Sequence, residues 1–269
     1  MDPIFICILI GTGLIAGFMS GLLGVGGGFL YAPVMYFVLR QSGVPDDMAI
    51  LVAFGTSLAA AFPTVLTGAF GHTKKGNVVW RDAVMMGLCG TVTGFIGGTV
   101  ATYLPVQILT LLFGVMLILG AIRLVTSLPS GTGEKMAAPL AAGIGGTTGF
   151  MSGLLGVGGG TILVPLMVLL GKFSMKKAAA TSAASILFIT VGGILSYLVN
   201  GFSAGIDLSA YGFYLIGYID VLMWAILVIT AIPMVLFAVK ISGRVPEVWL
   251  RRIFFILMLV IAIRMLIPS

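Results

Sequence analysis

Charged residues are scarce in this chain, and their scarcity excludes a water-soluble fold. Only 8% of the 269 residues are charged and 59% are hydrophobic, whereas a soluble domain usually carries about 25% charged residues. Apolar runs cover nearly the whole length, so no separate soluble domain has room to fold. The sequence therefore predicts an all-α, polytopic membrane protein, with the lipid bilayer as its first partner.

Cysteine, histidine and acidic residues are too few to build a disulfide framework, a metal site or a cation site. Cys7 and Cys89 fall inside apolar segments, where neither a disulfide framework nor a Cys-x-x-Cys metal pair can form. The eight acidic residues are expected in loops or at segment edges, which leaves no deep carboxylate to bind a cation. We therefore predict no catalytic residue, no metal site and no cofactor, and a substrate that is an anion.

The basic residues are better explained by membrane orientation than by nucleic acid. The formal charge is +6, but the fourteen basic residues are scattered through short loops and form no basic face. The only histidine, His72, is expected in a loop, either at the headgroup surface or in a pH-linked gate. Arg123 and Arg264 are expected near the membrane faces, where arginine either snorkels to headgroups or steers a substrate.

The chain contains an internal repeat. The sequence FMSGLLGVGGG occurs at 18–28 and again at 150–160, with eleven identities at an offset of 132. Further on, Thr56-Ser57 corresponds to Thr181-Ser182, and the two closing segments match at an offset of 141. We therefore divide the chain into a first repeat at 1–126, a linker loop at 127–136 and a second repeat at 137–269.

The positive-inside rule decides how the two repeats are related. If the chain turns back at each glycine motif, twelve basic residues share one side of the membrane and only Arg40 and Arg264 lie opposite. If it continues straight across, eight basic residues lie on one side of the membrane and six on the other, which indicates no orientation. The first reading predicts inverted repeats in the cell membrane with both termini extracytoplasmic. The twelve are Lys74, Lys75, Arg81, Arg123, Lys135, Lys172, Lys176, Lys177, Lys240, Arg244, Arg251 and Arg252.

Segment length also favours a turn at the motif. The apolar stretch 29–39 has eleven residues, or ~17 Å of helix, against a hydrocarbon core of ~30 Å. Each half is thus predicted to hold a helical hairpin broken at glycine, followed by three transmembrane helices. Many secondary transporters build a site near the membrane midplane from inverted repeats with broken helices.

The two glycine motifs are the predicted substrate site. Backbone groups freed at a break inside the membrane cannot face lipid, and a helix N-terminus attracts an anion. The alternative is that these glycines only allow close helix packing. The glycines concerned are Gly24, Gly26, Gly27, Gly28, Gly156, Gly158, Gly159 and Gly160.

Six hydroxyl residues are candidate ligands beside the glycines. Their hydroxyl groups either donate to the oxygens of a substrate or bond back to their own helix. Phe29 and Thr161, which follow the two motifs, break the symmetry, and we hypothesise that they shape substrate choice. The six are Ser20, Ser152, Thr56, Ser57, Thr181 and Ser182.

These motifs carry a resemblance to a known family. The duplicated SGLLGVGGG, the Thr-Ser pairs and the closing pattern from Arg244-Val245-Pro246 to Ile263-Arg264-Met265 resemble the sulfite exporter TauE/SafE family of membrane permeases. The resemblance implies export of a small inorganic or organic anion, with sulfite as the leading candidate and sulfonates next. An anion channel with the same site and a non-transporting membrane scaffold or sensor remain alternatives. A homodimer also remains open.

Overall fold

The computed structural model describes residues 2–125, 135–241 and 247–266, and these ranges are mostly helical. Most of the predicted linker, 127–134, and residues 244–246 of the closing pattern lie outside the described residues. The helices are α1 (Pro3–Leu23), α2 (Gly28–Gln41), α3 (Asp46–Lys74), α4 (Trp80–Ala101), α5 (Val106–Val125), α6 (Ala138–Leu155), α7 (Gly160–Leu169), α8 (Met175–Ala204), α9 (Val221–Ile241) and α10 (Glu247–Leu266). A short turn η1 (Ser209–Tyr211) and the paired strands β1 (Leu215–Ile216) and β2 (Ile219–Asp220) lie between α8 and α9.

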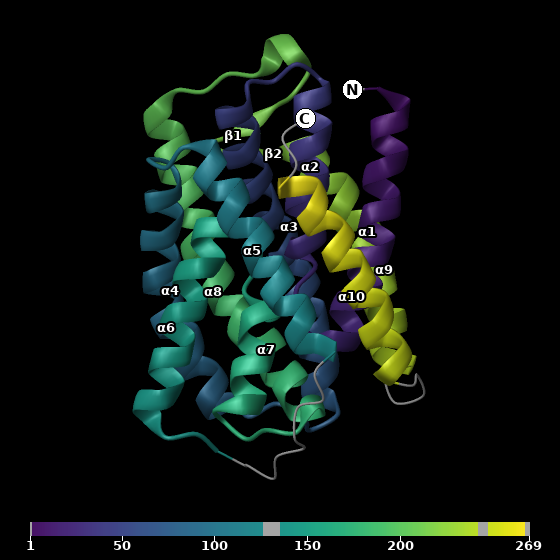
Figure 1. The fold of residues 1–269 in the computed structure, drawn as a ribbon, viewed down its shortest axis with the longest axis vertical. Coiled ribbons are helices and arrows are strands. Elements are labelled where there is room, and N and C mark those ends of the chain that lie inside the picture. Colours follow the sequence, from purple (N-terminus) through teal and green to yellow (C-terminus); the bar gives the residue numbers. More distant parts are fainter. Residues whose placement is uncertain (1, 126–134, 242–246, 267–269) are drawn as a thin grey trace.

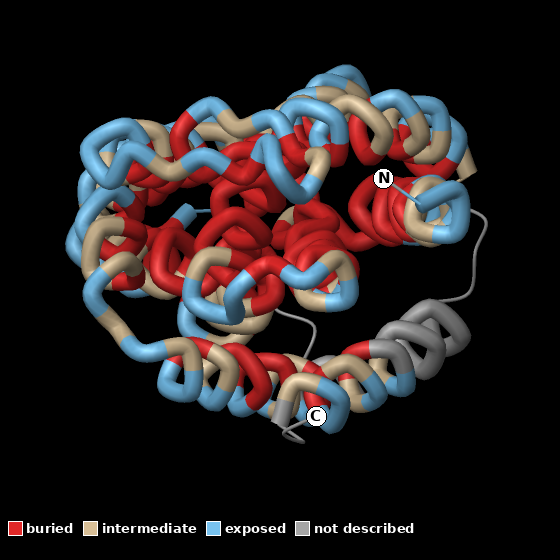
Figure 2. Tube along the Cα trace, turned by 90° about the horizontal axis from the view of Figure 1, so that it is seen from above, coloured by how far each residue is buried: buried red, intermediate tan, exposed pale blue. Residues whose placement is uncertain are grey.

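Five of the described helices, α1, α3, α4, α8 and α9, are long and apolar enough to cross a membrane. Their outward faces carry large apolar side chains, such as Val92 and Ile229, which are 64% and 70% exposed. Such a surface suits lipid and not water. Viewed end-on (Figure 2), the buried parts of the chain gather in the middle of the bundle and the exposed parts lie around its rim. The protein is therefore a multi-pass membrane protein.

Glycines at positive φ end α1 and α6 at equivalent places. Gly24 and Gly156 cap these helices with φ 66° and 66°, in the left-handed region that glycine adopts without steric cost. The next helices begin directly after Gly27 and Gly159, whose φ angles are 70° and 80°. The motif GVGGG thus stops one helix and starts another within five residues.

The two short helices that follow the motifs return to opposite ends of the molecule. In Figure 1, α1 begins at the upper end and α2 returns to it, whereas α6 begins at the lower end and α7 returns there. The turns between them pack backbone against backbone. A Cβ atom added to Gly28 would lie 2.6 Å from the Val157 carbonyl oxygen, and one added to Gly160 would lie 2.5 Å from that of Val25.

Small residues bring the outer helices into close contact. Helix α4 packs along α6, and α1 along α9. A Cβ atom on Gly149 would overlap the Gly90 carbonyl, and one on Gly17 would lie 2.5 Å from the Ala231 carbonyl oxygen. Close backbone approach of this kind is the main source of helix association in lipid, where the hydrophobic effect is absent.

We expect Gly149→Ala to lower the free energy of unfolding by about 1–3 kcal/mol, because the added methyl group must push α6 away from α4. Gly143→Ala is the matched control on the same helix, because nothing lies within 4 Å of an added Cβ there. It should be neutral or stabilising by up to about 1 kcal/mol through helix propensity. Thermal unfolding in detergent measures both, and equal melting temperatures for the two variants would contradict the proposed packing.

Candidate site at the glycine turns

The serines of the Thr-Ser pairs bind the glycine turns of the opposite half. The Ser57 hydroxyl on α3 donates to the Gly156 carbonyl oxygen at 2.7 Å and lies 3.1 Å from that of Gly28. The Ser182 hydroxyl on α8 donates to the Gly24 carbonyl oxygen at 3.3 Å. Both serines are fully buried. They therefore satisfy carbonyl groups that the breaks in α1 and α6 leave without helical partners.

The threonines of the same pairs accept hydrogen bonds from backbone N–H groups just before a helix of the opposite half. The Thr56 hydroxyl accepts a hydrogen bond from the Asp220 backbone N–H at 2.9 Å, just before α9. The Thr181 hydroxyl accepts one from the Val79 N–H at 3.0 Å, just before α4. The structure thus gives all four residues contacts with the backbone of the other half, a use that we did not consider from sequence.

His72 and Tyr197 occupy equivalent positions on α3 and α8. His72 lies in the last turn of α3, is only 5% exposed, and places Nε2 3.3 Å from the Gly21 carbonyl oxygen. The Tyr197 hydroxyl donates to the Gly153 carbonyl oxygen at 3.0 Å. The expectation of a surface loop for His72 was wrong, because α3 continues through the polar sequence that we took as a loop.

Three buried hydroxyl groups lie on or beside the second glycine turn. Thr148, Ser152 and Thr161 are 0%, 1% and 6% exposed, and among the described residues none of their hydroxyl oxygens has a hydrogen-bond partner. A Cβ on Gly159 would lie 2.7 Å from the Thr148 methyl carbon and 3.4 Å from the Ser152 Cβ, so both side chains border this turn. Thr161 lies in the first turn of α7, where backbone N–H groups lack helical partners.

The first glycine turn has a different lining. Ala16 and Phe29 stand where the second half has Thr148 and Thr161. A Cβ on Gly27 would lie 2.9 Å from the ring of Tyr31, which is fully buried, with its hydroxyl 3.5 Å from the Thr64 hydroxyl. The aromatic ring of Tyr31 therefore occupies the space beside the first turn. Of the two predicted serines at these turns, Ser20 and Ser152, only Ser152 belongs to a cluster of unpartnered hydroxyl groups.

Sequence reasoning missed Thr148. Its only signal was the mismatch with Ala16 at an offset of 132, and the two preceding positions also differ between the repeats. Thr161 was noted as a mismatch with Phe29 but was not placed among the site residues. Both positions carry threonine in one copy and an apolar residue in the other, but Thr147 opposite Ile15 has the same pattern and bonds back to Gly143 of its own helix.

The chemistry of this cluster suits an anion. Three hydroxyl groups can each donate an O–H, and the N-terminus of α7 adds a positive dipole end. No group of three or more His, Cys, Asp or Glu residues that could hold a metal ion occurs among the described residues. Two buried carboxylates, Asp82 and Asp220, lie at helix starts. The Asp82 carboxylate accepts a hydrogen bond from the Met136 N–H, and the Asp220 carboxylate accepts two, from the Met223 and Tyr214 N–H groups. Burial raises the pKa of Asp220, just outside α9.

Comparison with known proteins agrees with a transport role. The family model described as Sulfite exporter TauE/SafE matches residues 9–265. A probable membrane transporter protein of Methanocaldococcus jannaschii is 32% identical over 249 residues, covering 91% of this chain and 89% of the relative. One of Haemophilus influenzae is 30% identical over 268 residues, covering 97% of each. No solved structure matches the chain.

We expect Ser57→Ala to lower the free energy of unfolding by about 1–3 kcal/mol, because the buried Gly156 carbonyl loses its partner. Ser185→Ala is the control, since the Ser185 hydroxyl is equally buried but bonds only to Thr181 of its own helix. It should cost less than about 1 kcal/mol. Thermal unfolding of both variants in detergent tests this, and a Ser57→Ala protein as stable as Ser185→Ala would show that the bond is dispensable.

Proposed function

This chain belongs to the sulfite exporter TauE/SafE family of transmembrane transporters, and we propose that it carries a small oxyanion, sulfite or a sulfonate, out of the cell. The observation that carries the proposal is the cluster of three buried hydroxyl groups at the second glycine turn, none of which has a partner among the described residues. An unsatisfied buried hydroxyl group costs about 1–3 kcal/mol. A ligand that accepts three hydrogen bonds would recover that cost.

An oxyanion matches the cluster in charge and in hydrogen bonding. Sulfite and sulfonates present three oxygens that only accept hydrogen bonds, and Thr148, Ser152 and Thr161 offer three O–H donors. Hydrogen bonds to a charged acceptor are stronger than neutral ones, so they can replace part of the hydration that the anion loses in the membrane. The first turn of α7 adds N–H groups and a positive dipole end.

We propose further that the halves are inverted repeats, each with a hairpin broken at glycine. The sequence repeat, the opposite directions of the α1–α2 and α6–α7 pairs in Figure 1, and the reciprocal bonds of Ser57 and Ser182 support this reading. In such transporters, one repeat rocks against the other around a fixed site and exposes it to each side in turn. The site at Thr161 lies next to the contact between the two turns, where such a motion would open one side.

The proposed orientation places the start of α1 and the end of α10 outside the cell. Lys74, Arg81, Lys177 and Lys240 lie at helix ends on the opposite, cytoplasmic side, where positive charge is favoured. We propose that this membrane is the plasma membrane.

Removing either threonine hydroxyl group should reduce transport without loss of stability. We expect Thr148→Val and Thr161→Val each to lower sulfite flux about 10–100-fold, because each deletes one charge-assisted hydrogen bond worth about 1.5–3 kcal/mol. Because neither hydroxyl group has a hydrogen-bond partner among the described residues, its replacement by a methyl group should leave the melting temperature unchanged or raise it. The measurement is flux of radiolabelled sulfite and an alkanesulfonate in proteoliposomes, with thermal unfolding in parallel.

Thr190→Val is the matched control, since the Thr190 hydroxyl is buried but bonded to Ile186 of its own helix. It should keep wild-type flux. Wild-type flux in both Thr148→Val and Thr161→Val would remove the proposed site. No flux of any tested anion in the wild-type protein would favour a scaffold or sensor. A flux that rises with anion concentration and does not saturate would favour a channel.

A further inference from the structure

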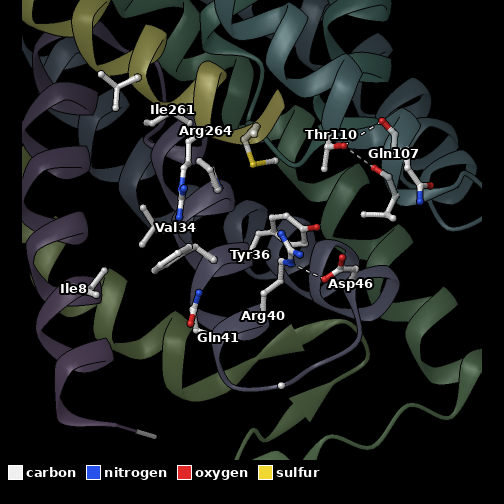
Figure 3. A pocket seen from close by; sticks show the side chains of 16 residues that line it. Ile8, Val34, Tyr36, Arg40, Gln41, Asp46, Gln107, Thr110, Ile261 and Arg264 are labelled. Carbon is white, nitrogen blue, oxygen red and sulfur yellow. Dashed lines mark hydrogen bonds and ion pairs between the residues drawn. The ribbon is translucent and has the colours of Figure 1, made fainter. Parts of the chain in front are cut away.

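A second candidate binding site lies far from the glycine turns, at the end of the molecule where α1 begins. A cavity of about 750 Å³ opens there between α1, α2, α5 and α10. None of the glycine-turn residues lines it. Figure 3 shows side chains from all four helices around this space. The first half supplies three of its walls and the second half supplies α10.

The cavity holds the two basic residues that lie apart from all the others in the predicted topology. The Arg40 guanidinium forms an ion pair with Asp46 at 2.6 Å and lies 5.5 Å from the centre of the Tyr36 ring. Arg264 extends from α10 toward α2, with its guanidinium 5.6 Å from the centre of the Phe37 ring (Figure 3). Among residues 2–125, 135–241 and 247–266, no carboxylate makes an ion pair with Arg264.

The rest of the lining is divided between polar and apolar groups. Gln41 and Gln107 supply amide groups to the lining. Val34, Phe37 and Ile261 form part of an apolar wall. Ligand pockets of this size usually bury an apolar body and use a few polar groups to orient it. A bare inorganic oxyanion would leave most of the cavity unfilled.

We propose that this cavity binds an amphipathic anion, with a sulfonate, carboxylate or phosphate head at Arg264 and an apolar tail along α2 and α10. The head would make charge-assisted hydrogen bonds with the guanidinium, whose planar fork suits oxyanions. The guanidinium lies over the aromatic ring of Phe37. Because the ligand would touch α2 and α10, its binding would tie the two halves together at this end.

Two sources supply this chemistry: a free alkanesulfonate, and an anionic lipid whose headgroup lies at this end of the bundle. The inference rests on the proposed function only where the free anion is taken as a transport substrate. Binding itself is independent of transport, so the two proposals can fail separately.

The test is calorimetric titration of the full chain in a neutral detergent with ethane-, butane- and hexanesulfonate, and separately with short-chain phosphatidylglycerol. We expect binding that tightens with chain length and a Kd about tenfold or more higher in Arg264→Gln. Arg264→Lys should recover part of the affinity, because it restores the charge without the fork. Arg81→Gln, which removes an exposed arginine from the start of α4, should bind like the wild type.

Sulfonate binding that depends on Arg264 supports the inference with a free anion as ligand. Dependence on Arg264 for phosphatidylglycerol alone supports it with lipid as the source. Equal affinities of wild type and Arg264→Gln for both ligands would overturn it, as would the same loss in Arg81→Gln. Binding that depends on Arg264 in a protein that transports no anion would leave this inference standing and remove the proposed function.

Discussion

The structure depends on one constraint: backbone groups freed at a helix break inside a membrane need partners within the protein. Helices α1 and α6 end at Gly24 and at Gly156, and in each case the freed carbonyl oxygen accepts a hydrogen bond from a serine hydroxyl on the long helix of the other half. The long helices α3 and α8 are buried around these bonds. Positive φ at the glycines allows the breaks, and the serines make them tolerable in an apolar interior.

The two turns share a backbone conformation and differ in their surroundings. Both are capped by glycine at φ 66° and both are held by serine. Beside the first turn lies the ring of Tyr31, whereas beside the second lie hydroxyl groups that no described residue satisfies. The duplicated residues thus build the frame, and the residues that diverged after duplication, such as Thr148, give one turn the chemistry of a binding site.

Much of the helical architecture was predictable, because composition and segment length leave few choices in lipid. Apolar runs located the membrane-crossing helices, and the glycine motifs located the ends of α1 and α6. The roles of individual side chains were not predictable, since they depend on which helices meet. Ser57 and Gly156 are 99 residues apart in the chain, and nothing local marks them as partners. His72 was misplaced because three polar residues follow it, although α3 continues through His72 and ends only at Lys74. The ligand roles of the glycines and serines remain predictions.

The reciprocal serine bonds have an evolutionary consequence. The carbonyl group of Gly156 is satisfied by Ser57, and that of Gly24 by Ser182, so neither half completes its own turn. A chain with a single copy of this unit would find that serine only in a second molecule, so it would complete its turn only as a pair. Two copies in one chain make the contact intramolecular, so each copy can carry its own residues and a pocket need not obey the symmetry of a dimer.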